Sequence, residues 1–165
     1  MAKKFVVDLD MRLSKNFTLR EMIRSSIAQR LGIDNTPTSF KVIEALTLLC
    51  QNVLQPIRDH FKKPVHVNSG YRGPKLNNAT PGSSRRSQHR KGEAGDIEIY
   101  GVSNLKLAQW IDNNIFFDQL ILEYHTAGRP NSGWVHVSIK LSGLREQVLS
   151  KLSGEKRYRK GLVTQ

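Results

Sequence analysis

The sequence has few of the features that define several large classes of protein. Cys50 is its only cysteine, so neither an intramolecular disulfide framework nor a multi-cysteine metal site can form. Cys50 lies in an apolar stretch, which favours a buried structural thiol over a reactive one. No apolar run approaches the roughly 18 residues of a membrane-spanning helix, and residues 1–10 lack the pattern of a secretory signal. We therefore expect a soluble protein made in a reducing cytosol.

Acidic residues are also scarce, since 14 Asp and Glu face 26 Lys and Arg and leave a formal net charge of +12. Such a surplus indicates a polyanionic partner: nucleic acid, an anionic membrane surface or an anionic wall polymer. No helix-turn-helix, zinc-finger or aromatic β-platform signature accompanies the charge, so we expect no specific nucleic-acid partner. The chain has no internal repeat, and its 165 residues favour one domain over 1–165.

Helix signals dominate the first half of the sequence. A capping box at Thr18 and Glu21 predicts a helix that runs to about residue 30, where Gly32 would end it. Apolar residues then recur at steps of three and four over residues 43–61. This spacing predicts a long helix with one buried face, kinked at Pro56.

Strand signals follow in the second half. We expect strands over residues 64–69, 95–100, 117–124 and 134–139, with a hairpin joining the last two, and a helix over 104–114. Residues 70–95 read as one long loop, a feature that is commonly functional in a compact domain. The basic segment 140–165 suits either a short helix over 144–152 or an extended tail. Helices followed by strands predict an α+β fold, with a small antiparallel sheet packed against N-terminal helices.

Three side chains stand in surroundings that suit a metal ion: His89, Asp96 and His136. Gly92, Ala94 and Gly95 separate the first two, so the backbone can turn tightly and bring both side chains to one point. His136 lies in the middle of a predicted strand, which fixes its direction. Two imidazoles and one carboxylate leave a fourth zinc position open, as in catalytic zinc sites. A zinc ion there would activate water and polarise a carbonyl group.

A family resemblance rests on these residues and their neighbours. The string Ser87-x-His89-x-x-Gly92-x-Ala94-x-Asp96, followed by Trp134-Val-His136, resembles peptidase M15, the D-alanyl-D-alanine carboxypeptidase family of zinc peptidases. Upstream, Ser69-Gly-Tyr-Arg72-x-Pro74 resembles the other signature of that family. The resemblance covers about residues 15–140, leaves 141–165 as a basic extension, and is similar to the small members found in phages and prophages.

The resemblance implies a hedgehog-like, D-Ala-D-Ala-peptidase-like fold and one Zn²⁺ per chain. Its ligands would be His89, Asp96 and His136. Arg72 corresponds to the arginine that binds the substrate carbonyl or carboxylate and supports the oxyanion. Ser87 corresponds to the serine two residues before the first ligand. It would orient His89, bind substrate or cap a turn, and these alternatives stay open.

The general base is where the sequence departs from the family pattern. Family members commonly carry an acidic residue a few positions before the last histidine ligand, but position 133 is Gly here. We expect Glu123 to serve as the general base in place of that acidic residue, because a hairpin can place it on the same sheet face as His136. Glu98, His125 or the absence of any base are the alternatives.

The resemblance implies a zinc metallopeptidase that hydrolyses peptidoglycan stem peptides, as a D,D-carboxypeptidase or an L-Ala-D-Glu endopeptidase. The alternative is a virion or structural protein that keeps the fold and the metal with little or no activity. Basic residues such as 85–86 and 90–91 would attract an anionic peptide or envelope, or simply be solvated. We expect a monomer made in the cytoplasm. It would act in the periplasm or cell wall, after release by a holin or as part of a phage particle.

Overall fold

The computed structural model describes residues 5–164 and has an α+β fold, which confirms the predicted class. Its helices are α1 (Leu19–Ile23), α2 (Ser26–Leu31), α3 (Phe40–Leu49), α4 (Gln55–Phe61), α5 (Pro74–Ala79) and α6 (Asn104–Asn114), with a π-helical turn η1 (Cys50–Leu54) and a 3₁₀ turn η2 (Gln88–Lys91). Its strands are β1 (His66–Ser69), β2 (Ala94–Glu98), β3 (Gln119–Glu123), β4 (Trp134–Ser138), β5 (Gln147–Lys151) and β6 (Arg159–Lys160). Among these helices, none is long and apolar enough to cross a membrane.

The single helix predicted after Thr18 is wrong, because the chain forms two short helices there. Thr18 caps α1 as expected, but Arg24 adopts an extended conformation and ends it. The hydroxyl of Ser25 then accepts a hydrogen bond from the amide three residues later and starts α2, which Gly32 ends in the left-handed conformation. A serine that can cap a new helix competes with continuation of the old one.

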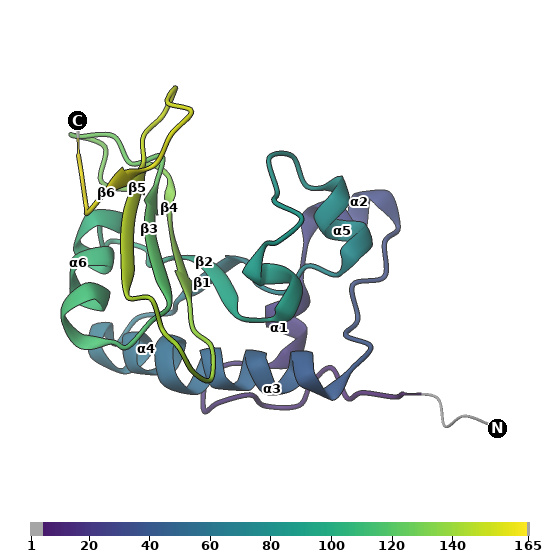
Figure 1. Cartoon of the computed structure of the whole chain (residues 1–165). Coiled ribbons are helices and arrows are strands. Elements are labelled where there is room, and N and C mark those ends of the chain that lie inside the picture. The colour runs from purple at the N-terminus through teal and green to yellow at the C-terminus, as the bar shows by residue number, and fades with distance from the viewer. Residues whose placement is uncertain (1–4, 165) are drawn as a thin grey trace.

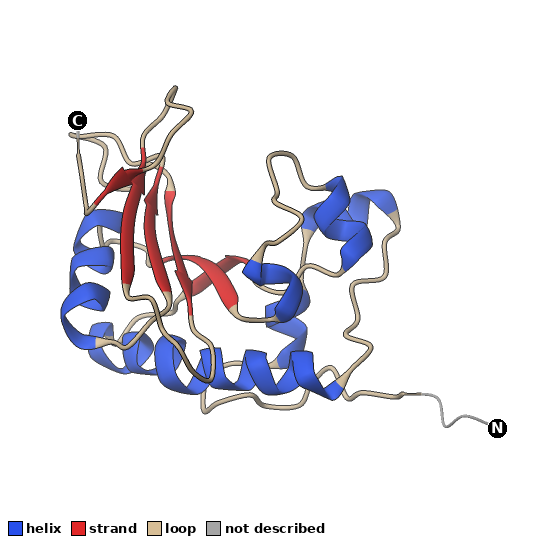
Figure 2. Cartoon of the chain, in the orientation of Figure 1, coloured by secondary structure: helices blue, strands red, loops and turns tan. Residues whose placement is uncertain are grey.

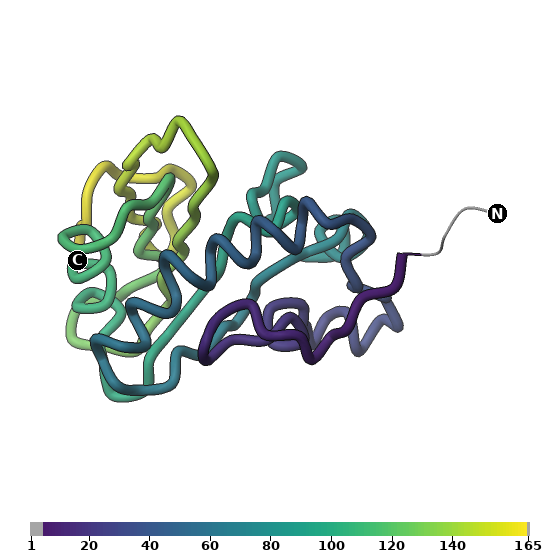
Figure 3. Tube along the Cα trace, turned by 90° about the horizontal axis from the view of Figure 1, so that it is seen from below, coloured from purple at the N-terminus to yellow at the C-terminus, as the bar shows by residue number. Residues whose placement is uncertain are grey.

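The long apolar helix is present from Phe40 to Phe61, with an irregular middle. Pro56 has no amide hydrogen to donate, and the chain widens into the π-helical turn η1 just before it. The amide of Gln55 accordingly donates to the carbonyl of Cys50, five residues back. Seen from below, this helix crosses the underside of the molecule (Figure 3). Cys50 is fully buried in it as predicted, and burial raises the pKa of its thiol.

The strands form one six-stranded sheet, in the order β1-β2-β4-β3-β5-β6 (Figure 2). The predicted β3–β4 hairpin is confirmed, with Ile121 opposite His136. The apolar residues on either side of Ile121 in β3 and of His136 in β4 face α6 and the core. Because side chains alternate between the two faces of a strand, Ile121 and His136 lie on the opposite face of the sheet.

The C-terminal segment joins this sheet. The short helix considered for residues 144–152 does not form: β5 pairs parallel with β3, and β6 pairs antiparallel with β5. The edge of β3 offers unpaired backbone groups, which an extended segment satisfies and a helix would not.

The predicted loop over residues 70–95 contains two short elements. Pro74 begins α5, where its missing amide hydrogen costs nothing at a first helical position. Further on, η2 ends at Gly92 in the left-handed conformation. The prediction of one uninterrupted loop is therefore wrong, because proline and glycine here start and stop helical turns.

Candidate metal centre

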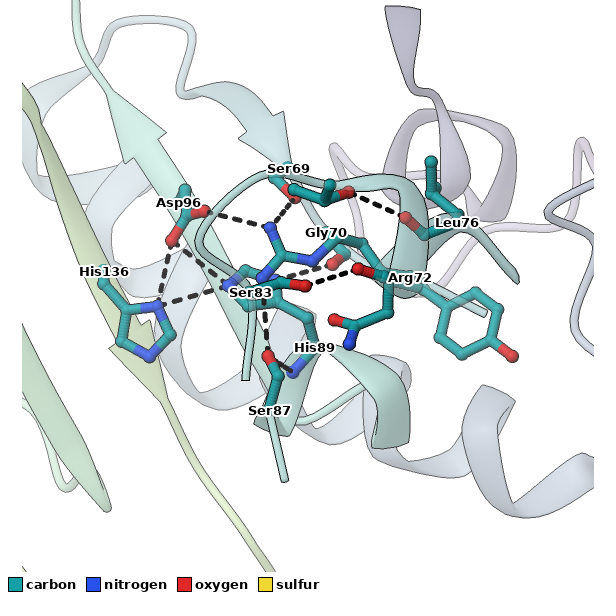
Figure 4. A network of polar contacts seen from close by, with 12 residues as sticks. Ser69, Gly70, Arg72, Leu76, Ser83, Ser87, His89, Asp96 and His136 are labelled. Atoms are coloured by element: carbon teal, nitrogen blue, oxygen red, sulfur yellow. Dashed lines mark hydrogen bonds and ion pairs between the residues drawn. The ribbon is translucent and has the colours of Figure 1, made fainter. Parts of the chain in front are cut away.

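Three side chains from three elements meet at one buried point: His89 of η2, Asp96 of β2 and His136 of β4 (Figure 4). Asp96 Oδ1 lies 3.2 Å from His89 Nε2 and 2.9 Å from His136 Nδ1. The two ring nitrogens are 3.2 Å apart. All three residues are at most 8% exposed.

Sheet register and one glycine bring the three together. Asp96 and His136 are direct partners in the β2–β4 ladder, which places their side chains side by side on one face. His89 reaches them because the chain turns sharply at Gly92, whose φ is +76°. A Cβ atom on Gly92 would lie 2.8 Å from the carbonyl oxygen of Val42, so this turn needs glycine.

The donor atoms fit a tetrahedral zinc ion. Zinc–ligand bonds of about 2.0–2.2 Å in tetrahedral geometry separate the donors by about 3.3–3.6 Å, close to the spacing seen here. His89 Nδ1 lies 2.7 Å from the carbonyl oxygen of Gly70 and donates to it, which leaves Nε2 with a free lone pair. Burial alone would raise the pKa of Asp96, but the two histidines outweigh burial and hold that pKa well below its ordinary value. The carboxylate is thus ionised, as a metal ligand must be.

Arg72 lies beside this group. Its Nη1 is 3.2 Å from Ser69 Oγ and 3.9 Å from Asp96 Oδ2, and its backbone amide donates to the carbonyl of His89 at 3.0 Å. Contacts of both its backbone and its side chain therefore hold the guanidinium next to His89, Asp96 and His136.

Of the roles considered for Ser87, the structure shows the cap of a turn. Its hydroxyl accepts from the amide of His89 at 3.3 Å and so caps the turn that carries this residue. The same hydroxyl also accepts from Arg72 Nη2 at 3.4 Å. Ser87 links the histidine to the arginine and also lines the cleft.

Glu123 is the last residue of β3 and shares a sheet face with Ile121 and His136. It lines the same cleft as the three metal-binding candidates. Burial raises its pKa to about 7, and the charge of Asp96 adds to the rise, while nearby cationic side chains oppose it. A partly buried carboxyl group with such a pKa is suited to accept a proton near neutral pH.

The two alternative bases lie elsewhere. Glu98 accepts a hydrogen bond from Asn68 Nδ2 at 2.5 Å, and His125 is 5% exposed. Neither residue lines the cleft that contains His89, Asp96 and His136. Glu123 is thus the candidate that the fold brings to the site.

The cleft that His89, Asp96 and His136 line has a volume of about 410 Å³. Cationic and aromatic side chains line it: Arg72, Arg86, Arg145, Tyr124, Trp134 and Tyr158. Sequence reasoning missed Arg145 and Tyr158, which come from the C-terminal segment. No local pattern distinguishes them from the other residues of that basic segment, and only the pairing of β5 with β3 brings the segment to the cleft.

Comparison with known families agrees with this geometry. A family model described as Peptidase M15 matches residues 15–138, which is most of the chain and includes all three metal-binding candidates. No curated protein matches the sequence. Because the match extends over well more than half of the sequence, the chain belongs to the peptidase M15 family of zinc metallopeptidases.

Proposed function

We propose that this protein is a zinc-dependent hydrolase that cleaves a peptide bond in the stem peptide of peptidoglycan, as a D,D-carboxypeptidase or an L-Ala-D-Glu endopeptidase. The observation that carries the proposal is the meeting of His89, Asp96 and His136 beside Glu123 and Arg72 in one cleft. Family membership supports the metallopeptidase class, and the bond cleaved is our proposal.

His89, Asp96 and His136 would hold the metal through Nε2, Oδ1 and Nδ1. A zinc ion with three protein ligands and one open position makes water more acidic and polarises a carbonyl group. The hydrogen bond from His89 Nδ1 to the carbonyl of Gly70 fixes the ring in the orientation that this role needs.

Glu123 acts as the general base. Its carboxylate takes a proton from the water that attacks the scissile carbonyl carbon. The same carboxyl group then gives that proton to the nitrogen of the leaving amine as the carbon–nitrogen bond breaks. Arg72 donates N–H groups to the carbonyl oxygen, on which negative charge develops during the attack.

The substrate class agrees with the charge of the protein. Stem peptides carry carboxylates, and the chain has a formal net charge of +12. Long-range attraction of this kind raises the rate at which an anionic substrate arrives. We propose a monomer of phage or prophage origin that acts on the cell wall, with the basic segment 141–165 near the anionic envelope.

Purified stem peptides and intact peptidoglycan test the proposal directly. Zinc-loaded protein is incubated with each, and products are identified by mass spectrometry. Loss of a terminal D-Ala would show carboxypeptidase activity, and release between L-Ala and D-Glu would show endopeptidase activity. Bound zinc with no product from either substrate would instead favour the alternative, a structural component that retains the fold.

A further inference from the structure

A second arginine of the cleft is held by a buried carboxylate. Arg145 lies in the connection between β4 and β5, outside the residues 15–138 that match the family. Its Nε and Nη2 donate to Asp118 Oδ2 at 3.0 and 2.5 Å, and its backbone amide donates to Asp118 Oδ1 at 3.1 Å. Three hydrogen bonds to one side chain fix the orientation of this arginine.

Asp118 is buried and is paired with two cationic side chains. Its side chain is 1% exposed, and Lys140 Nζ lies 3.1 Å from its Oδ1. A buried carboxylate is tolerated because cations and donors satisfy it. Two cations, Lys140 and Arg145, share this single anion, so the cluster keeps one unit of positive charge beside the cleft.

One edge of the guanidinium remains available. Nη2 of Arg145 also donates to Gln88 Oε1 at 3.3 Å, but Nη1 has no hydrogen-bond partner within residues 5–164. The side chain is 48% exposed and lines the cleft. Two N–H donors of Nη1 can therefore bind an acceptor on a molecule in the cleft.

The sheet register places this arginine toward one end of the cleft. Gln119, Ile121 and Glu123 follow one another along the cleft-lining face of β3, so they span about 13 Å at about 3.3 Å per residue. His136 is opposite the middle residue, Ile121, and Arg145 is bonded to Asp118, next to the first. An extended peptide would thus place a group at Arg145 about two residues from the reacting bond.

We propose that Arg145 is a specificity-determining residue, which binds a carboxylate of the substrate about two residues from the scissile bond. This inference rests on the proposed function, because it takes an acidic stem peptide as the substrate. Arginine suits the task, since its charge is permanent and Asp118, bound to Nε and Nη2, already fixes the plane in which the N–H groups of Nη1 lie.

The test measures binding rather than turnover, in a Glu123→Gln background that leaves the peptide intact. The probes are three fluorescent stem pentapeptides: the parent, one with the D-Glu α-carboxylate converted to an amide, and one with an amidated C-terminus. We expect one of the two amides to bind about tenfold more weakly than the parent, as the loss of a charge-assisted hydrogen bond predicts.

Arg145→Gln, made in the same background, identifies the residue responsible. It should bind the parent about tenfold more weakly and no longer distinguish that amide from the parent. Arg30→Gln is the matched control, because it removes the same charge from an exposed position of α2 and should keep the discrimination. Arg145→Lys keeps the charge, but one ammonium group cannot bind both Asp118 and the substrate in the same way, so this variant should retain only part of the discrimination.

Two results would overturn the inference: equal binding of all three peptides, or unchanged discrimination by folded Arg145→Gln protein. The peptide comparison needs no substitution at Arg145, so it holds even where that variant is unstable. Absence of cleavage by the wild-type protein, with carboxylate discrimination intact, would reject the proposed hydrolysis and keep the binding role.

Discussion

Gly133 packs directly on the backbone of Glu123: a Cβ atom at position 133 would lie 1.7 Å from the carbonyl oxygen of Glu123. No side chain fits there, so this hairpin excludes an acidic residue at position 133. Glu123 on the neighbouring strand lines the cleft instead. The close approach therefore gives a physical reason why the carboxylate of the site comes from β3 rather than from the start of β4.

Substitution of Gly133 by alanine should destabilise the protein strongly. The residue has a φ of +68°, and its contact is with backbone that cannot move aside. We expect a loss of about 3 kcal/mol or more in the free energy of unfolding. Gly128→Ala is the control, because Gly128 also has a positive φ, +76°, but nothing lies within 4 Å of its Cβ position. Urea denaturation should show a loss of only about 1 kcal/mol for it, and equal losses would refute the steric explanation.

Glu123→Gln should retain zinc and lose turnover. An amide is nearly the size of the carboxyl group but cannot take a proton, so we expect kcat to fall about 10²–10⁴-fold. Elemental analysis of bound zinc and kinetics on a stem peptide provide the two measurements. Glu98→Gln serves as the control and should be almost fully active, because Glu98 does not line the cleft. A fully active Glu123→Gln protein would reject the assignment.

The stability of the metal-free protein should depend on pH through Glu123. Folding raises its pKa from 4.5 to about 7, so the protonated form is favoured in the folded state. The stability that this group contributes is present below about pH 4.5 and is lost as the pH rises to about 7.

At pH 8 and with a chelator present, Glu123→Gln should therefore unfold at a higher urea concentration than the wild type. The free energy of unfolding of the Glu123→Gln protein, compared with that of the wild type, should be about 1–3 kcal/mol more favourable to the variant at pH 8 than at pH 5. Glu98→Gln should show no such difference between the two pH values. A Glu123→Gln protein whose relative stability does not change with pH would show that the carboxyl group is not desolvated.

His136→Ala should abolish stoichiometric zinc binding. Removal of one of three ligands leaves only His89 and Asp96, and the wild type should lose its zinc to a strong chelator. Native mass spectrometry measures the ion directly, and zinc should raise the melting temperature of the wild type but not that of the His136→Ala protein. His66→Ala removes an exposed histidine of β1 and should bind zinc normally. Equal zinc binding by the His136→Ala protein would place the metal elsewhere.

The sequence by itself determined the parts of the fold that depend on near neighbours. Ser103 caps α6 as predicted, the amphipathic face of residues 43–61 is buried, and the alternating residues of β3 and β4 form a hairpin. These features follow from hydrogen bonds and apolar periodicity within short stretches of chain. The candidate role of His89 and Asp96 rests instead on the family resemblance of the whole string around them, because a His and an Asp at this spacing also occur by chance.

The tertiary structure alone decided how distant segments meet. Residues 144–152 carry apolar residues that suit either a helix or a strand, and only the free edge of β3 selects the strand. That pairing brings Arg145 and Tyr158 to a cleft whose other walls lie far away in sequence. Likewise, Gly133 is an ordinary turn residue until the backbone of Glu123 lies against it. Local propensities do not specify such contacts, because their free energy arises only when both partners are already in place.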